Sequence, residues 1–213
     1  ALHAPGLGYY AGGARKLGAG GDFVTAPELS PLFGRALARQ IAQILQPGEA
    51  ILEFGAGSGV LAEVLLSELD GVKYEILETS PELRDRQQKR LGTRVHWLDQ
   101  LPRSFRGVML ANEVVDAMPV HALAWTRNGI LERGVCVNES QLAWSDRAAD
   151  GLILDQARIL EVEIPPSGRY ESELALFARA WMRSLGRFLE RGAVFVIDYG
   201  FPAREYFHPQ RSM

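Results

Sequence analysis

The stretch Ala50-Ile-Leu-Glu-Phe-Gly-Ala-Gly-Ser-Gly59 decides the fold of this chain. An apolar run that contains an acid leads into three glycines, and the apolar pattern of a helix follows over residues 60–69. We interpret the stretch as a strand, a tight turn and the start of a helix. Glycines at such a turn let the backbone approach a ligand closely, because they carry no Cβ. The helix N-terminus then offers free N–H groups to an anionic group.

Three classes of ligand use such a turn: phosphates, dinucleotides and S-adenosylmethionine. Val60 stands where the phosphate loop requires lysine and where the dinucleotide motif G-x-G-x-x-G requires its third glycine. Glu53 would also face a pyrophosphate as a like charge. S-adenosylmethionine carries a sulfonium, an ammonium and a carboxylate, which suit an acid beside helix N–H groups. The motif therefore favours S-adenosylmethionine over NAD.

A second acid supports a nucleoside cofactor. Glu78 follows Gly59 by nineteen residues and ends the next short apolar run, where a βαβ unit places a carboxylate beside the ribose hydroxyls. Asp99, after a third run, would lie near the adenine amine, although an exposed turn aspartate fits equally well. The predicted cofactor contacts are Thr25, Glu53, Phe54, Gly55, Ala56, Gly57, Gly59, Glu78, Thr79 and Asp99.

The order of elements predicts the fold class. Helices are expected from Ser30-Pro31 to about residue 45, from residue 60, and from Ser80-Pro81 to Gly92, and strands at 51–54, 74–77, 94–98, 108–111 and 193–197. A further helix carries apolar residues from Leu174 to Phe188 and is expected to close at Gly192. This alternation predicts an α/β, Rossmann-like class I methyltransferase fold with a mostly parallel twisted sheet.

The pattern changes between the fourth and fifth strands. Short alternating runs at 121–125, 130–137 and 141–144 predict antiparallel hairpins inserted into the sheet fold, which could serve dimerisation or substrate docking. We divide a single domain into an N-terminal helical and loop extension (1–46), a cofactor-binding half (47–119), a β-rich insertion (120–170) and a last helix and strand (171–213). Sheets of this type usually continue through two more strands, so we expect these C-terminal strands to be absent from the chain.

Composition excludes several function classes. A net charge of −3 argues against a general nucleic-acid binder, and no apolar run approaches the roughly 20 residues of a membrane span. The chain has one cysteine, Cys136, and four widely spaced histidines, so we predict neither a disulfide framework nor a metal site.

Polar residues after the fourth strand indicate where a methyl acceptor would bind. Asn112, Glu113 and Asp116 follow the apolar run 108–111 at the edge where open α/β sheets bind ligands. Two carboxylates there could hold a guanidinium in a fixed orientation. Alternatively, Glu113 or Asp116 caps a following short helix.

Several strings together resemble the MidA-like family of S-adenosylmethionine-dependent methyltransferases, which is related to the mitochondrial arginine methyltransferase of complex I assembly. They are Gly8-Tyr-Tyr10, Gly20-Gly-Asp-Phe-Val-Thr-Ala-Pro-Glu28, Ser30-Pro-Leu-Phe-Gly34, Glu53-Phe-Gly-Ala-Gly-Ser-Gly59, Ser80-Pro-Glu-Leu83, Ala111-Asn-Glu-Val-Val-Asp-Ala-Met-Pro119, Ile197-Asp-Tyr-Gly-Phe201 and His208-Pro-Gln-Arg211. The string around Asp22 is the most specific, because generic methyltransferases lack it.

The resemblance implies a seven-stranded methyltransferase fold. It implies symmetric dimethylation of a protein arginine, with a large hydrophilic core subunit of respiratory complex I as substrate of the mitochondrial member. By position, it places Glu53, Glu78 and the glycines of the turn at the cofactor, and the segment 112–116 and the Asp22 loop beside the transfer site. The expected location is the cytoplasm of a bacterium, or the mitochondrial matrix for the eukaryotic relative.

The leading hypothesis is therefore a protein arginine methyltransferase, with Asn112, Glu113, Asp116 and Asp22 as catalytic residues. A methyltransferase with another acceptor is the nearest alternative. A non-catalytic complex I assembly factor and an NAD-dependent oxidoreductase remain as further classes.

Overall fold

The structure is a computed structural model that describes residues 2, 4, 7–9, 25–160 and 168–212. It divides the chain into two compact units, each described here by itself. The parallel-sheet unit comprises Ala1–Ala117 and Met182–Asp198, and the antiparallel-sheet unit comprises Met118–Trp181 and Tyr199–Met213. The grouping of the chain as a single domain stays a prediction. Among the described residues, no helix is both long and apolar enough to cross a membrane.

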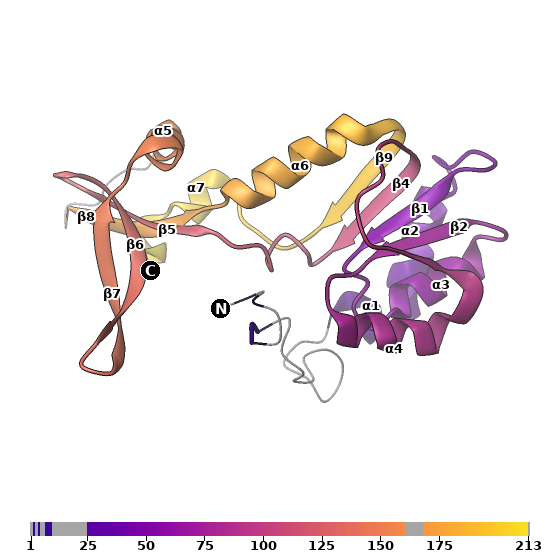
Figure 1. Ribbon diagram of the computed structural model, residues 1–213. Coiled ribbons are helices and arrows are strands. Elements are labelled where there is room, and N and C mark those ends of the chain that lie inside the picture. The colour runs from indigo at the N-terminus through magenta and orange to yellow at the C-terminus, as the bar shows by residue number, and fades with distance from the viewer. Residues whose placement is uncertain (1, 3, 5–6, 10–24, 161–167, 213) are drawn as a thin grey trace. The chain divides into compact units, whose positions relative to one another are not determined.

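The parallel-sheet unit holds five parallel strands in the order β3-β2-β1-β4-β9 (Figure 1). The strands are β1 (Ala50–Phe54), β2 (Lys73–Leu77), β3 (His96–Leu98), β4 (Phe105–Asn112) and β9 (Leu189–Ile197). The register sets Phe54 opposite both Leu77 and Ala111, so the strands beside β1 end at the same level. The α/β fold with a parallel sheet, predicted from the alternation of elements, is confirmed.

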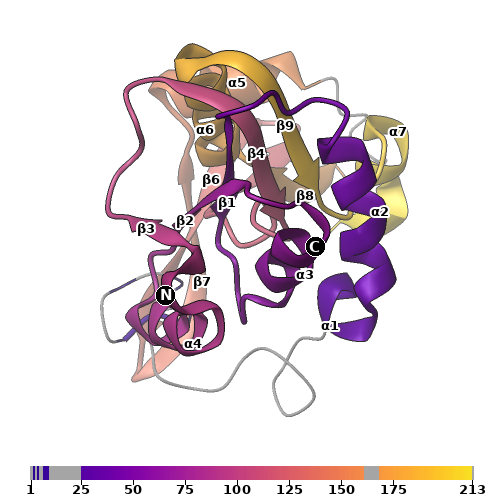
Figure 2. The same cartoon turned by 90° about the vertical axis from the view of Figure 1, so that its right-hand side faces the viewer.

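Three helices of this unit begin where the sequence predicts, at Pro31, Val60 and Pro81, whereas a short helix before them, Ala26–Leu29, was not predicted. In chain order these helices are α1 (Ala26–Leu29), α2 (Pro31–Ile41), α3 (Val60–Glu68) and α4 (Pro81–Leu91), and α1, α2 and α3 are neighbours (Figure 2). The Ser30 and Ser80 hydroxyls accept hydrogen bonds from the amides of Leu32 and Leu83, and a proline follows each serine at the first helical position. Their core joins fully buried side chains of α2, α3 and the strands, among them Ile41, Ile51, Leu65 and Ile76.

The antiparallel-sheet unit has its own sheet in the order β7-β6-β5-β8. It is formed by β5 (His121–Thr126), β6 (Gly129–Asn138), β7 (Gln141–Ala148) and β8 (Arg169–Leu174), with α5 (Gly151–Ile159) and α7 (Ala203–Tyr206) in the same unit. β5 to β8 lie between β4 and β9 in the chain, so the predicted antiparallel insertion between the fourth and fifth parallel strands is confirmed. α5 and β8 are elements that the sequence did not predict.

The boundary between the last helix and the fifth parallel strand was predicted wrongly. α6 spans Leu176–Phe188 and not 174–191, because Leu174 belongs to β8, where it pairs with His121. Gly192 does not close the helix but lies inside β9 opposite Gly107. Its φ is +129°, and a Cβ there would lie 1.7 Å from the carbonyl oxygen of Gly107. Glycine serves here for a close approach of two strands.

Candidate functional site

The predicted site lies at the carboxyl ends of β1 and β4. β1 is followed in the chain by β2 on one side of it, whereas β4 lies on its other side. The chain therefore leaves β1 toward β2 on one side and leaves β4 toward β9 on the other side. The position between β1 and β4 is thus a topological switch point of the sheet. Open α/β sheets bind their ligands at the carboxyl end of such a point. The loops after these two strands are therefore the first candidates for ligand contacts.

The glycine turn has the conformation that the sequence predicts. Gly55, Gly57 and Gly59 have φ of +58°, +55° and +80°, values that residues with a Cβ rarely adopt. Gly59 is the N-cap of α3, and the amide of Gly55 donates to the carbonyl of Leu77 at 3.0 Å. The turn thus presents a backbone without side chains, directly before a helix N-terminus of the kind that attracts anionic groups.

Glu53 lies inside the protein, with 2% of its surface exposed. Its Oε2 accepts a hydrogen bond from the hydroxyl of Tyr74 at 2.8 Å. Burial raises the pKa of Glu53 to about 7, the Tyr74 hydroxyl opposes this rise, and the nearby charge of Glu78 adds to it. The carboxyl group predicted to hold the cationic end of a cofactor is therefore buried, fixed in position and partly protonated near neutral pH.

Glu78 follows β2 and is held by two donors. Its Oε1 accepts from the amide of Ser80 at 2.9 Å, and its Oε2 accepts from Nε2 of Gln87 at 2.9 Å. Burial raises the pKa of Glu78, and hydrogen bonds from Ser80, Gln87 and Thr79 oppose that rise. A carboxylate has about four acceptor positions, so one held in this way can still accept a hydrogen bond from a ribose hydroxyl.

The other predicted cofactor residues differ in exposure. Phe54 and Ala56 are buried at the end of β1 and in the turn, and Thr79 is exposed beside Glu78. Thr25 is the N-cap of α1 but makes no side-chain capping bond. Asp99 has 83% of its side chain exposed, and its Oδ1 accepts a hydrogen bond from Nη1 of Arg84 at 2.6 Å. This environment matches the alternative that the sequence left open, an exposed turn aspartate. Asp22 lies outside the described residues.

The loop after β4 has a conformation unusual for its residues. Glu113 has a φ of +51°, in the region that favours glycine. Its amide donates to the carbonyl of Ile197 at 2.8 Å, at the end of β9. One oxygen of Asp198, Oδ2, accepts from the amides of Val115 at 3.0 Å and Asp116 at 3.2 Å. The strand end β9 and Asp198 thus hold the loop in a defined and strained shape, which is common at functional sites.

The same loop gathers negative charge. Burial raises the pKa of Glu113, the charges of Asp116 and Asp198 raise it further, and a hydrogen bond with the backbone of Ala26 opposes them. Asn112 and Glu113 are partly buried, and Asp116 is exposed. A bound cation would relieve the repulsion among these three carboxylates. The arrangement therefore suits a positively charged acceptor group.

The structure brings the glycine turn and the loop after β4 together. A Cβ added to Gly55 would lie 3.4 Å from Cγ2 of Val114, so the two loops are in contact range. Ser58 of the turn is also hydrogen bonded, through its hydroxyl, to Glu28 of α1. Cofactor turn and acceptor loop therefore form one continuous surface of the parallel-sheet unit.

Three functional candidates were missed in the sequence reading: Tyr74, Gln87 and Asp198. Tyr74 precedes Glu78 by four residues on β2 and contacts Glu53 on the neighbouring strand, which only the pairing of β1 with β2 reveals. Gln87 follows Glu78 by nine residues and lies on α4. Asp198 directly follows β9, and only the geometry of the loop after β4 shows that it accepts two backbone hydrogen bonds.

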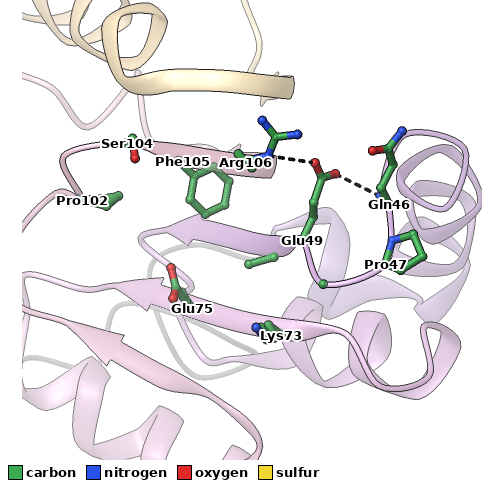
Figure 3. A pocket seen from close by; sticks show the side chains of 11 residues that line it. Gln46, Pro47, Glu49, Lys73, Glu75, Pro102, Ser104, Phe105 and Arg106 are labelled. Carbon is green, nitrogen blue, oxygen red and sulfur yellow. Dashed lines mark hydrogen bonds and ion pairs between the residues drawn. The ribbon is translucent and has the colours of Figure 1, made fainter.

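A separate pocket lies at the opposite, amino edge of the same sheet (Figure 3). It has a volume of about 430 Å³ and is lined by side chains that include Glu49, Lys73, Glu75 and Arg106. Figure 3 shows Glu49 joined to Arg106 and to Gln46. Because ligands of open α/β sheets bind at the carboxyl edge, we do not assign the cofactor to this pocket.

Comparison with known proteins identifies relatives of the whole described fold. Residues 32–213 match the model of a protein family described as "Putative S-adenosyl-L-methionine-dependent methyltransferase". The crystal structure of a candidate methyl transferase from Burkholderia thailandensis, bound to S-adenosyl-homocysteine, is 44% identical with a TM-score of 0.89. The match between the two structures covers 99% of this chain and 59% of the Burkholderia chain.

Two curated relatives are mitochondrial protein arginine methyltransferases. NDUFAF7 of Danio rerio is 33% identical over 168 residues, covering 61% of this chain and 39% of the relative. The Drosophila melanogaster homologue is 27% identical over 237 residues, covering 92% of this chain and 54% of the relative. The chain thus spans about two fifths to three fifths of the length of these similar proteins.

Proposed function

Since the chain belongs to this family of S-adenosyl-L-methionine-dependent methyltransferases, we propose that it binds S-adenosylmethionine at the carboxyl edge of its parallel sheet and transfers the methyl group to a protein arginine. The observation that carries the proposal is the contact between the glycine turn and the carboxylate-bearing loop after β4. The first is suited to the cofactor and the second to a cationic acceptor.

The residues of the cofactor side fit S-adenosylmethionine. The glycines at 55, 57 and 59 leave room at the backbone, and the N-terminus of α3 faces the turn that they form. Glu78, with each oxygen already held by one protein donor, would receive the ribose hydroxyls. Glu53 would contribute negative charge near the sulfonium end from its buried position, and a nearby cation would lower its pKa and keep it ionised.

The acceptor side would hold the arginine. Glu113 and Asp116 carry two carboxylates on one short loop, and two such groups can bind a planar guanidinium through several hydrogen bonds. Binding of the cation would lower the raised pKa of Glu113 and so favour its ionised form. Asn112 would complete the wall of this site, and the catalytic role of Asp22, which lies outside the described residues, stays a prediction of the sequence.

The cofactor supplies an electrophilic methyl group on a positively charged sulfur. The acceptor loop contributes by positioning a guanidinium nitrogen in line with the methyl group, since methyl transfer depends mainly on orientation. The new bond joins that nitrogen to the methyl carbon, the sulfur keeps the electrons of the broken bond, and the guanidinium loses one proton. Carboxylates at Glu113 and Asp116 stabilise the positive charge of the acceptor before that proton leaves.

The substrate is the finer part of the proposal. The relatives named above are protein arginine methyltransferases. For the mitochondrial member, the resemblance to the MidA-like family implies a core subunit of respiratory complex I as the substrate. We propose that this chain also methylates a protein subunit of that kind, and that the hairpins of the antiparallel-sheet unit help to bind that protein. A dimer through the same unit and a cytoplasmic location stay predictions of the sequence.

Two measurements test the proposal. Calorimetry with S-adenosylmethionine and NAD in parallel should detect binding of the first alone. Labelled methyl transfer into a lysate from a strain that lacks this protein, followed by mass spectrometry, should then place the label on arginine. Glu113→Ala should retain cofactor binding and lose methylation by roughly 100-fold, since it removes a positioning group for the acceptor.

Glu75→Ala is the matched control for this variant, because Glu75 is a glutamate that lines the pocket at the amino edge of the same sheet. It should leave both cofactor binding and methylation unchanged. Binding of NAD in place of S-adenosylmethionine would overturn the cofactor assignment. Unchanged methylation in Glu113→Ala would overturn the role of that residue, and label on another side chain would overturn the arginine acceptor.

A further inference from the structure

Gln87 is a fully buried polar side chain on a helix whose surface is otherwise largely charged. Its exposed fraction is 0%, whereas the neighbouring Gln88 is exposed. Burial of an amide is unfavourable unless its donors and acceptor are paired. Each of its groups has a partner: Nε2 donates to the carbonyl of Gly57 at 3.0 Å and to Glu78 at 2.9 Å, and Oε1 accepts from Trp97 at 3.0 Å.

The indole of Trp97 fixes the orientation of this amide. Nε1 of tryptophan can only donate a hydrogen bond, so the amide atom facing it must be the oxygen. The amide nitrogen then faces two acceptors, the carbonyl of Gly57 and the carboxylate of Glu78. A reversed amide would place its oxygen against both acceptors and its nitrogen against a donor, which loses all three hydrogen bonds.

The two acceptors belong to different parts of the cofactor site. Gly57 is the middle glycine of the turn, and Glu78 follows the neighbouring strand β2. In a trans peptide the C=O and the next N–H point in opposite directions, so holding the carbonyl of Gly57 also fixes the direction of the Ser58 amide. One side chain therefore sets both the peptide plane of the turn and the orientation of the acid.

We propose that Gln87 is a positioning residue that couples the glycine turn to Glu78 and thereby sets the affinity and the hydroxyl selectivity of the nucleoside site. The inference rests on the proposed binding of S-adenosylmethionine. The ligand feature it recognises, through Glu78, is a ribose with free 2′ and 3′ hydroxyls. Gln87 itself does not touch the ligand. Its donation to Glu78 also favours the ionised, acceptor-only form of that carboxylate against burial.

Calorimetry with S-adenosyl-homocysteine and its 2′-deoxy analogue tests the proposal on the purified full chain. Gln87→Met keeps a similar volume and removes all three hydrogen bonds. We expect roughly tenfold weaker binding of S-adenosyl-homocysteine than in the wild type. The deoxy analogue should lose less affinity, because it lacks one hydroxyl that Glu78 would receive, so discrimination between the two ligands falls. Gln88→Met, the matched control on the exposed side of α4, should bind both as the wild type does.

A thermodynamic cycle with Glu78→Gln separates positioning from a general structural role. If Gln87 acts in part through Glu78, adding Gln87→Met to Glu78→Gln should weaken binding by clearly less than Gln87→Met does in the wild type, because the part of the loss that passes through Glu78 occurs only once. Losses that simply add, with unchanged selectivity, would overturn the proposal, as would unaltered affinity in Gln87→Met. Failure of the wild type to bind S-adenosyl-homocysteine would instead contradict the proposed function.

Trp97→Phe provides a second test if Gln87→Met does not fold. It removes the indole donor and leaves the amide of Gln87 free to reverse. We expect a smaller loss of affinity than in Gln87→Met, roughly threefold for the ligand with both hydroxyls and less for the deoxy analogue. Equal losses for both ligands would show that the amide does not act through Glu78.

Discussion

Glu49 and Glu53 lie near opposite ends of β1, and the side chain of each has little exposed surface, but their environments have opposite effects on their charge. Glu49 has 7% of its side chain exposed, at the amino edge of the sheet, and its pKa is held below the ordinary value by the amide of Gln46 and by Arg191. Glu53, exposed by 2%, accepts a hydrogen bond from the Tyr74 hydroxyl, and its pKa is raised to about 7. The same residue type is stabilised as an anion at one end and disfavoured as an anion at the other.

The difference extends to the two edges of the sheet. At the amino edge Arg191 and Arg106 pair with Glu49, and Arg106 also reaches Glu190. At the carboxyl edge the pKa values of Glu78 and Glu113 are raised by burial, as that of Glu53 is. Acids kept in such an unfavourable state are typical of functional sites, where a ligand supplies the missing charge. The charge pairs of the amino edge are therefore of the kind that stabilise a fold, whereas the acids of the carboxyl edge support the proposal that this edge binds a cationic ligand.

The pH dependence of the free energy of unfolding is the strongest test of the contrast between Glu53 and Glu49. The folded-state pKa of Glu53 lies above its unfolded value of about 4.5, so the folded protein binds the extra proton between pH 4.5 and 7 and loses stability as the pH rises through that range. Glu53→Gln removes this loss. Relative to the wild type, its free energy of unfolding should improve by up to about 3 kcal/mol between pH 4.5 and 7.5.

Glu49→Gln should show the opposite trend. The folded-state pKa of Glu49 is lowered, so its contribution is present above the unfolded pKa and disappears as the pH falls through the folded pKa. The variant should therefore be less stable than the wild type at neutral pH, and the difference should shrink below about pH 4.5. Urea unfolding at several pH values measures both effects, and parallel trends in the two variants would contradict the contrast.

The sequence predicted the parallel-sheet unit well because its signals are local. Ser30-Pro31 and Ser80-Pro81 mark helix starts through capping and a fixed φ, and three glycines mark the cofactor turn. The predicted MidA-like family and its cofactor agree with the family match and with the neighbour bound to S-adenosyl-homocysteine. The predicted site residues stay proposals, although Glu53, Glu78 and Glu113 all have raised pKa values.

The parts that failed depend on partners distant in the chain. Gly192 resembles a helix terminator until Gly107 is found opposite to it, because only the pairing of β4 with β9 shows the close approach. β8 becomes a strand through its pairing with β5, almost fifty residues earlier. Gln87 is one of two adjacent glutamines, and nothing local distinguishes it from Gln88. Packing alone makes one buried and the other exposed.

One glycine at each edge of the sheet, Gly55 at the carboxyl edge and Gly48 at the amino edge, provides a test of the contrast with a smaller expected effect. Gly55 and Gly48 have φ of +58° and +86°, so alanine at either position should cost about 1 kcal/mol of stability through backbone strain. A Cβ at Gly48 meets nothing within 4 Å, whereas at Gly55 it enters the turn beside Val114. Gly55→Ala should therefore weaken S-adenosylmethionine binding by roughly tenfold, and Gly48→Ala should not. Equal affinity in the two variants, measured by calorimetry, would remove the turn from the site.

The Tyr74 hydroxyl gives the smallest effect and isolates one hydrogen bond. Tyr74 is 3% exposed and donates to Glu53 at 2.8 Å, so Tyr74→Phe should cost about 1 kcal/mol at pH 5, where Glu53 is protonated. The loss of stability should be larger at pH 8, since the Tyr74 hydroxyl stabilises the Glu53 anion and its removal raises the pKa of Glu53 further.

Tyr206→Phe is the matched control, because the Tyr206 hydroxyl donates to Glu173 at a longer 3.3 Å from a partly exposed position. Its cost should be smaller and nearly independent of pH. A pH-independent loss in Tyr74→Phe would mean that Glu53 does not titrate between pH 5 and 8 in the folded protein, which would contradict its raised pKa of about 7 and leave the contrast between the two ends of β1 without support at Glu53.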